Sequence, residues 1–547
     1  MSRRLHRKSR RSLLVIALAV CALCAAGIGI GVAISGSPKD APPSAAQRAD
    51  FAGILPAPIS ATPTAGQFTI TGATSIHVSA DSAPALAVAD YLATLLRPAT
   101  GYPLPVAATA DTGGTGVIRL VLTGGGDKKL DAEGYRLDVS DDQITATAAQ
   151  PAGLFYAVQT LRQLLPPQSD ERGTQRGVVW SVPAGHVLDY PRFVYRAAGL
   201  DVARHFFGVA DVERYIDEIA LYKVNYLHLH LTDDQGWRLA IDDWPKLTEV
   251  GARTEVGGGA GGFYTQDDYR KLVAYAQARY VTIIPEIDLP GHVTAALASY
   301  PELSCDGKAR SVFTGIDTGF SSLCAAKPAT FSFLADVIRQ IAALTPGPYV
   351  GIGGDEAQAT SAADYAKIVG EAAADVRADG KAPWGWQETA NASIGTPAVA
   401  TYWNPGLPGA AIKQAADNGT QLVLDPANHT YLDQKYDAST ALGLHWAGYV
   451  DVQKAYAWDP GTYLPGVNQD AILGVEADLW TETVATTGDI DYMAFPRLPA
   501  VAEIGWSAES THDWPAFRDR LAAQGPRWRA MGVKYYHSPE VPWPAGS

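Results

Sequence analysis

The sequence is poor in cysteine, with only four among its 547 residues. Cys21 and Cys24 fall within the first 35 residues, so the rest of the chain holds only Cys305 and Cys324. No group of residues has the spacing of a metal-binding cluster. In an oxidising compartment an isolated pair this close indicates one disulfide, worth about 3 kcal/mol in the chain-entropy model. Two free buried thiols are the alternative.

Basic residues are also scarce: 43 Lys and Arg stand against 57 Asp and Glu, giving a formal net charge of −14. Six of the basic groups lie in the first 35 residues, which contain no acid, so the remaining chain carries about −20. Such an acidic surface argues against binding of nucleic acid or of anionic membranes. It suits a soluble protein with a neutral or cationic ligand.

The N-terminus has the composition of a targeting segment. Six basic residues precede an uninterrupted apolar run over residues 13–34, which indicates export. The run is long enough to span a bilayer, yet Ala33-Ile34-Ser35 offers a cleavage site, and residues 9–14 loosely match a twin-arginine signal. Residues 1–35 are therefore either a signal peptide or an N-terminal membrane anchor. Both place the body of the protein outside the cytoplasm, secreted or anchored. Neither Cys21 nor Cys24 follows a small residue, as a lipidation site requires.

Three further segments follow. Residues 36–66 are rich in Pro, Ala and Ser, which predicts a linker. Residues 67–190 mix short β-type runs with helical patterns and predict a small α+β domain. Its expected strands cover residues 68–70, 117–122, 135–139 and 144–146, and its expected helices cover 86–96 and 153–165.

Residues 191–547 alternate strand-like runs with amphipathic helices. The eight runs cover residues 195–204, 225–234, 281–292, 349–356, 382–388, 398–404, 421–433 and 472–482. This order predicts an α/β fold, a (β/α)₈ TIM barrel, whose site lies at the carboxyl ends of the strands. A doubly wound sheet is the competing architecture, but no glycine-rich phosphate loop follows the first run.

Two adjacent acids, Asp355 and Glu356, follow a short apolar run and two glycines. Gly353 and Gly354 let the backbone bend, so the neighbouring side chains need not point to opposite faces. Most Asp-Glu pairs are solvated turn residues, and the pair alone is a weak signal. It gains weight because other predicted strands end in the same way.

Acids and aromatic residues stand at the ends of most of the later runs. In chain order they are Glu286, Asp288, His292, Asp355, Glu356, Trp386, Trp403, Tyr431, Asp433, Trp480 and Glu482. Flat aromatic faces stack on the C–H faces of a pyranose, and carboxylates accept hydrogen bonds from its hydroxyls. A single tryptophan usually packs in the core, but three at successive strand ends favour a sugar-binding site.

A series of motifs occurs in one order along the chain. The stretches are Gly353-Gly354-Asp355-Glu356 and residues 195–206, 228–238, 285–292, 385–388, 402–403, 431–433 and 479–482. In these the sequence resembles the family 20 glycoside hydrolases, the β-N-acetylhexosaminidases. Residues 134–135, 153–156 and 159–161 resemble that family's N-terminal domain. The resemblance covers about residues 67–535.

The resemblance implies substrate-assisted hydrolysis, an exception to the usual scheme of two carboxylates. Glu356 would protonate the leaving glycosidic oxygen and then activate water. Asp355 would hold the acetamido N–H, and Tyr431 would hydrogen-bond the acetamido oxygen. That oxygen would attack the anomeric carbon and give an oxazolinium-like intermediate, so no nucleophile from the protein is needed.

The resemblance also implies a binding pocket for one terminal sugar. Trp386, Trp403 and Trp480 would enclose the N-acetyl methyl group. The residues implied to bind ring hydroxyls at the closed end of the pocket, and so to make the enzyme exo-acting, are Arg196, Asp433 and Glu482.

Two further residues, Asp233 and His292, would orient Glu356 from behind. A general acid must stay protonated at the working pH, so we expect a raised pKa of Glu356 and a mildly acidic pH optimum.

Two positions depart from the family pattern. The family usually has histidine where this chain has Gly351 and again where it has Gln358. One interpretation is a change behind the carboxylates that lowers the rate or moves the pH optimum. The other is a degenerate site that binds sugar without cleaving it, which would make the protein a carbohydrate-binding protein.

His228 and His230 resemble the metal pair of barrel hydrolases. Metal chemistry needs further ligands at later strand ends, where this chain has Trp and Tyr instead. We therefore expect both to support the barrel, and we expect no metal or other cofactor. The preference between GlcNAc and GalNAc, the group attached to the sugar and the oligomeric state do not follow from the sequence.

Overall fold

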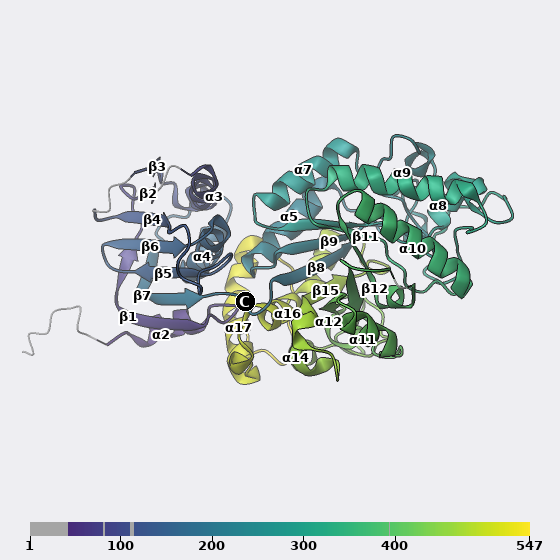
Figure 1. Ribbon diagram of the computed structural model, residues 1–547. Coiled ribbons are helices and arrows are strands. Elements are labelled where there is room, and N and C mark those ends of the chain that lie inside the picture. Colours follow the sequence, from purple (N-terminus) through teal and green to yellow (C-terminus); the bar gives the residue numbers. More distant parts are fainter. Residues whose placement is uncertain (1–41, 80–81, 110–113, 393, 547) are drawn as a thin grey trace, which may run out of the picture. The chain divides into compact units, whose positions relative to one another are not determined.

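The computed structural model describes residues 42–79, 82–109, 114–392 and 394–546 (Figure 1). The targeting segment and residues 36–41 of the predicted linker lie outside these ranges. Among the described residues, no helix is both long enough and apolar enough to cross a membrane.

The first domain is built on a mixed seven-stranded sheet with the order β1-β7-β5-β6-β4-β2-β3. Its strands are β1 (Ser60–Thr69), β2 (Ser75–Val78), β3 (Val106–Ala108), β4 (Val117–Leu122), β5 (Tyr135–Val139), β6 (Gln143–Ala148) and β7 (Ser181–Asp189). Helices α3 (Ala83–Thr100) and α4 (Pro151–Leu164) pack on each other and on the sheet. Val88, Leu92 and Leu96 of α3 are buried at helical spacing. The predicted α+β domain is confirmed.

The predicted linker is wrong over residues 43–66. Helix α2 (Ala45–Ala52) begins at Ser44, whose side chain forms a capping box with Gln47, and Phe51 is buried. Strand β1 follows at the edge of the sheet, where Pro63 pairs with Gly185. An edge strand tolerates proline because its missing N–H is not needed by a second neighbour. Composition rich in Pro, Ala and Ser therefore did not distinguish an edge element from a linker.

The second domain is a closed barrel of eight parallel strands, with β8 and β15 hydrogen-bonded to complete the circle. Its strands are β8 (Tyr195–Asp201), β9 (Tyr226–His230), β10 (Thr282–Glu286), β11 (Tyr349–Gly351), β12 (Ala382–Trp386), β13 (Val399–Tyr402), β14 (Gln421–Leu424) and β15 (Ile472–Leu479). Each lies within one predicted run, so the (β/α)₈ barrel is confirmed.

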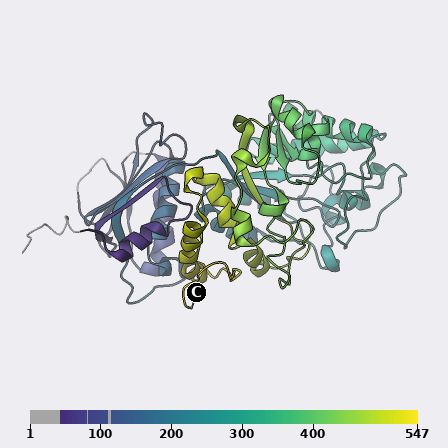
Figure 2. The same ribbon diagram turned by 90° about the horizontal axis from the view of Figure 1, so that it is seen from below.

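Helices follow the strands in both views of the ribbon (Figures 1 and 2). The longer ones are α5 (Val209–Leu221), α7 (Gln266–Gln277), α9 (Pro328–Leu344), α10 (Ala362–Ala378), α11 (Ala410–Asp417), α15 (Thr487–Ala494), α16 (Arg497–Trp506) and α17 (Trp514–Met531). The shorter ones are α6 (Lys246–Glu249), α8 (Thr294–Ser299), α12 (Ala427–Thr430), α13 (Val452–Tyr456) and α14 (Pro460–Tyr463). Helix α7 begins with a capping box formed by Thr265 and Asp268.

The barrel interior is layered along its axis. At the amino ends of the strands the rings of Tyr195 and Tyr226 stack with centroids 4.5 Å apart, and Tyr349 packs against both. The Tyr195 hydroxyl donates to Glu476, which begins a buried polar layer. Beyond that layer, the loops after the strands bring acids and aromatic rings together around a pocket.

Candidate active site

A pocket of about 300 Å³ lies at the carboxyl ends of the barrel strands. Its lining residues are Arg204, Ile316, Thr318, Asp355, Glu356, Trp403, Asn404, Tyr431, Asp433, Leu444, Trp446, Trp480 and Glu482. Seven of the residues predicted from the sequence are therefore in one pocket, because the carboxyl ends of parallel barrel strands meet on one face.

A tight turn after β11 presents the two acids. Gly353 and Gly354 have φ values of 62° and 105°, which only glycine adopts without strain. A β-carbon on Gly353 would lie 1.8 Å from a carboxylate oxygen of Asp288, so the turn needs this close approach. Glu356 itself has a φ of 43°, and backbone strain of this kind at a residue other than glycine is typical of functional sites.

His292 lies directly behind both acids. Its Nε2 is 3.6 Å from a carboxylate oxygen of Asp355 and 3.6 Å from one of Glu356, and its Nδ1 is 3.2 Å from Asp233. Burial alone would lower the pKa of His292, but Asp233, Asp355 and Asp288 outweigh it and raise that pKa well above its usual value. His292 is thus a buried cation between the two adjacent acids and Asp233.

Aromatic rings form one side of the pocket. The rings of Trp403 and Tyr431 stack with centroids 6.1 Å apart, and Trp480 lies 6.0 Å from Tyr431. Trp386 is 1% exposed and packs against Trp480 and Trp403, so it supports these two rings without lining the pocket itself. Its indole N–H donates to Glu286 at 2.8 Å. The three tryptophans lie together, but only Trp403 and Trp480 of the predicted three line the pocket.

Burial raises the pKa values of two pocket residues, Tyr431 and Asp433. Burial and the carboxylates of Asp425 and Asp478 raise the pKa of Tyr431 well above its usual value, so its hydroxyl stays protonated. Burial and the neighbouring Glu482 raise the pKa of Asp433 well above its usual value. Both groups line the pocket and offer polar atoms to a ligand.

Arg196 does not reach the pocket, which contradicts the prediction that it binds a sugar hydroxyl. It is the second residue of β8, whereas the pocket lies beyond the last residue, roughly 17 Å further along at 3.3 Å per residue. Its guanidinium instead bonds Glu133 of the first domain and the carbonyls of Phe193 and Lys223. The predicted run over residues 195–204 covers both ends of β8, and Arg196 lies at the amino end, away from the pocket.

Arg204, which lies in the motif over residues 195–206 but had no predicted role, lines the pocket instead. It follows the carboxyl end of β8, pairs with Asp233 at 2.7 Å and lies 5.0 Å from the centre of the Trp480 ring. Trp446, 52% exposed at the rim, was also missed. It lies in an irregular segment after β14, so no strand end pointed to it.

Glu388, in the motif over residues 385–388, also had no predicted role. Its carboxylate accepts the indole N–H of Trp403 at 3.0 Å and so orients the Trp403 ring in the pocket wall. Burial and the charge of Asp355 raise the pKa of Glu388 to about 7.

The histidine pair of β9 is held by carboxylates. His228 lies 2.7 Å from Glu476 and 2.8 Å from Glu286, and His230 lies 2.5 Å from the same oxygen of Glu286. These are hydrogen-bond distances, whereas two ligands of one zinc ion each stand about 2.0–2.2 Å from the metal and further from each other. The histidines therefore link the barrel interior to Asp233, which His230 contacts at 3.0 Å.

Gly351 stands where no side chain fits. A β-carbon there would lie 2.8 Å from the β-carbon of Glu286. The neighbouring Trp384 is fully buried against His228 and Trp386, with ring centroids 4.3 Å and 5.0 Å away. The space is thus filled by Glu286 and Trp384 from adjacent strands. Gln358, the second departure, lies against Gly319 in the loop after β10.

A disulfide joins Cys305 and Cys324, whose Cα atoms are 4.9 Å apart, as the sequence predicted. It closes the base of the loop that carries Ile316 and Thr318 to the pocket wall.

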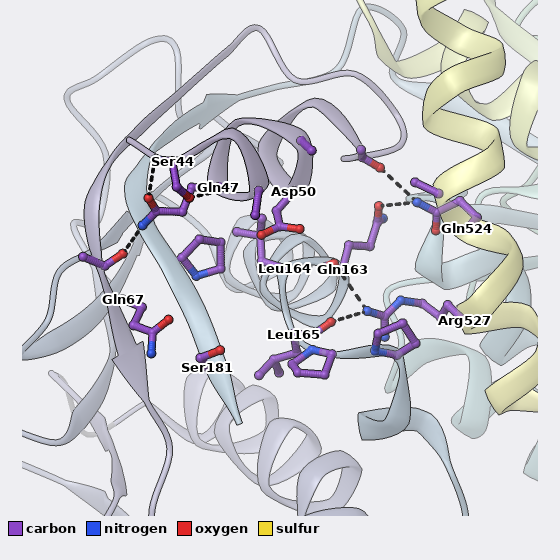
Figure 3. Close-up of a pocket in the computed structure, with 18 residues that line it drawn as sticks. Ser44, Gln47, Asp50, Gln67, Gln163, Leu164, Leu165, Ser181, Gln524 and Arg527 are labelled. Carbon is purple, nitrogen blue, oxygen red and sulfur yellow. Dashed lines mark hydrogen bonds between the residues drawn. The ribbon is translucent and has the colours of Figure 1, made fainter. Parts of the chain in front are cut away.

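A larger pocket, about 730 Å³, lies elsewhere, between α2, α4 and α17 (Figure 3). Two of its long polar side chains already have partners: Gln524 donates to Gln163 and to the carbonyl of Gly53, and Arg527 donates to the carbonyls of Gln163 and Leu165. Size alone therefore does not locate the site.

The fold and the site define a class of protein. The model of the glycosyl hydrolase family 20 catalytic domain matches residues 193–509, and that of glycosyl hydrolase family 20 domain 2 matches residues 52–190. The chain therefore belongs to glycosyl hydrolase family 20, as its motifs indicated.

Its relatives include enzymes of one activity. A beta-N-acetylhexosaminidase of Cellulomonas fimi is 43% identical over 90% of this chain and 97% of its own length. Among solved structures, the family 20 beta-N-acetylhexosaminidase of Streptomyces coelicolor A3(2) is 51% identical with a TM-score of 0.87, covering 90% of this chain and 99% of that one. A mutant Streptomyces plicatus beta-hexosaminidase in complex with product GlcNAc is also 51% identical with a TM-score of 0.87, covering 93% and 100%.

Proposed function

We propose that the protein is an exo-acting β-N-acetylhexosaminidase, which removes terminal non-reducing β-linked GlcNAc or GalNAc with retention of configuration. One observation carries the proposal: Asp355 and Glu356 lie side by side on the wall of a small aromatic pocket, each 3.6 Å from Nε2 of the same buried histidine, His292. Tyr431 and the indoles of Trp403 and Trp480 line that pocket as well. The activity of the relatives supports the same conclusion.

In the first step the carboxyl proton of Glu356 passes to the glycosidic oxygen as its bond to C1 breaks. The substrate's acetamido oxygen forms the new bond to C1 and gives an oxazolinium ion. Asp355 accepts the acetamido N–H and balances the positive charge that develops. Tyr431, which stays protonated, donates to the acetamido oxygen and fixes its direction of attack.

In the second step the Glu356 carboxylate takes a proton from water, whose oxygen attacks C1. The bond between C1 and the acetamido oxygen breaks, and the acetamide is restored. Two displacements at C1 retain the anomeric configuration. The sugar hydroxyls would be held by Arg204, Asp433 and Glu482 at the inner end of the pocket.

The test is release of nitrophenol from p-nitrophenyl N-acetyl-β-D-glucosaminide by the full chain and by Glu356→Gln, each with and without EDTA. Loss of the acid should lower kcat by about 1,000-fold or more while N-acetylglucosamine still binds. Equal turnover in the variant would exclude this role of Glu356. A folded chain that binds the sugar without turnover would instead be a carbohydrate-binding protein.

We further propose that the protein acts outside the cytoplasm, released or held by its N-terminal apolar segment. The Cys305–Cys324 disulfide supports this, because disulfides persist in oxidising compartments. Fractionation of producing cells, with N-terminal sequencing of the mature chain, distinguishes the released from the anchored form.

A further inference from the structure

Two buried carboxyl groups face each other behind the pocket. Asp288 is 2% exposed, and one of its oxygens accepts the N–H of Gly354 at 3.1 Å. Its other oxygen and one oxygen of Asp355 meet no N–H or O–H donor in the described chain. Both side chains lie beside His292, and a hydrogen bond from Asp288 lowers the pKa of Asp355. A proton shared between the two carboxyl groups would give both orphan oxygens a partner.

Two ionised carboxylates cannot satisfy each other, because both only accept hydrogen bonds. A single proton between them removes the repulsion and supplies the missing donor. Burial and the charge of Asp355 raise the pKa of Asp288 well above its usual value, which favours Asp288 as the protonated member. The titratable groups that face Asp288 are Asp233, Glu286, His292 and Asp355, with His230 close by.

We propose that Asp288 is a positioning residue that stays neutral during catalysis and donates its carboxyl proton in a hydrogen bond to Asp355. This inference rests on the proposed function. The bond to Gly354 fixes one oxygen of Asp288, so the O–H group points at Asp355. The second oxygen of Asp355, on the side of His292, remains free to accept the acetamido N–H of the substrate. Asp355 is thereby held as an anion in one orientation.

Asp288→Asn tests the proposal, because an amide reproduces a neutral carboxyl: its oxygen can accept from Gly354 and its NH₂ can donate to Asp355. We expect kcat within about threefold of wild type and unchanged limbs of the pH profile of kcat/KM. Asp288→Ala leaves both partners unsatisfied, and we expect kcat to fall about 100-fold. Glu218→Gln is the matched control, since it changes a buried acid of raised pKa on α5, outside the pocket, and should leave the profile unchanged.

If Asp288 were an anion, Asp288→Asn would remove a negative charge beside Asp355 and move the alkaline limb to lower pH. That shift, or a loss as large as in Asp288→Ala in a variant with the wild-type circular dichroism spectrum, would overturn the proposal. Activity that depends on added Ca²⁺ and disappears with EDTA would also overturn it, because a cation would then join the two orphan oxygens.

A second readout does not need turnover. Infrared difference spectra on addition of N-acetylglucosamine should contain a neutral carboxyl band that is present in wild type and Glu218→Gln and lost in Asp288→Asn. Its presence in all three proteins would refute the shared proton. If wild type binds the sugar without hydrolysing it, the proposed function fails, while this band still decides whether Asp288 is neutral.

Discussion

Two buried arginines on one strand and its following loop, Arg196 and Arg204, have opposite environments. Arg196, at the amino end of β8, makes bonds through all three guanidinium nitrogens, to Glu133 and to two backbone carbonyls. Arg204, beyond the carboxyl end, pairs with Asp233, yet its Nε finds no acceptor among the described residues and it lines the pocket. A fully satisfied buried group holds domains together, whereas unused hydrogen-bonding capacity at the carboxyl ends of barrel strands marks the place of a ligand.

Replacing each arginine by methionine should separate these two roles and gives the largest effects. Arg204→Met should lower kcat/KM about 100-fold or more, because the sugar loses a charged donor inside the pocket. Arg196→Met leaves the Glu133 carboxylate without its cationic partner at a domain boundary and should lower the free energy of unfolding by about 3 kcal/mol. Kinetics per folded molecule and urea unfolding measure the two quantities.

Arg196→Met should keep the wild-type kcat/KM at temperatures where it is folded. A large loss of kcat/KM in that folded variant would break the comparison, since it would mean that the amino end of the barrel reaches the chemistry. Arg204→Lys serves as the conservative control, because it keeps the charge but loses the planar donor geometry.

Much of the site was predictable because parallel barrel strands gather their carboxyl ends on one face. Asp355, Tyr431, Asp433, Trp480 and Glu482 could be placed together without knowing where each strand starts. Arg196 was misplaced for that very reason: the run over residues 195–204 contains both ends of β8, and apolar patterning does not say which residue is inside the strand. Boundaries of elements are less certain in sequence patterns than their existence.

Other features depended on partners distant in the sequence. The pairing of Asp288 with Asp355 and the depth of Trp386 arise from packing between different strands, which no local pattern records. The edge strand β1 was read as linker, because Pro63 is unfavourable in a central strand and acceptable at an edge.

Gly351 gives a second, smaller test, which asks whether the barrel interior at this position is closely packed or has room for a side chain. Gly351→His should lower the free energy of unfolding by about 2–3 kcal/mol and should not raise kcat, because even its β-carbon would overlap Glu286. Gly351→Ala should show part of the same loss. Urea unfolding and kcat of both variants check this. A faster and equally stable Gly351→His would mean that the barrel interior has room for an imidazole beside the acids.

The smallest predicted effect concerns pH and compares a buried acid outside the pocket with those inside it. Burial and the charge of Asp491 raise the pKa of Glu218 to about 8, so the folded chain binds more protons than the unfolded chain between pH 4.5 and 8. Stability contributed by this group is therefore present at low pH and is lost as pH rises through that window. Burial alone would lower the pKa of His230, but the charge of Glu286 outweighs it and raises that pKa to about 9. His230 therefore extends the same loss of stability above pH 6.5.

Glu218→Gln removes one titrating group without touching the pocket, so it should flatten the fall in stability between pH 7 and 8 by about 1 kcal/mol. The free energies of urea unfolding at pH 7 and pH 8, for wild type and variant, give the difference directly. An identical slope in both proteins would mean that Glu218 is ionised in the folded state and that Arg214, 3.0 Å away, outweighs its burial. Since the activity profile should not change in this variant, the result also separates protons that stabilise the fold from protons that serve the site.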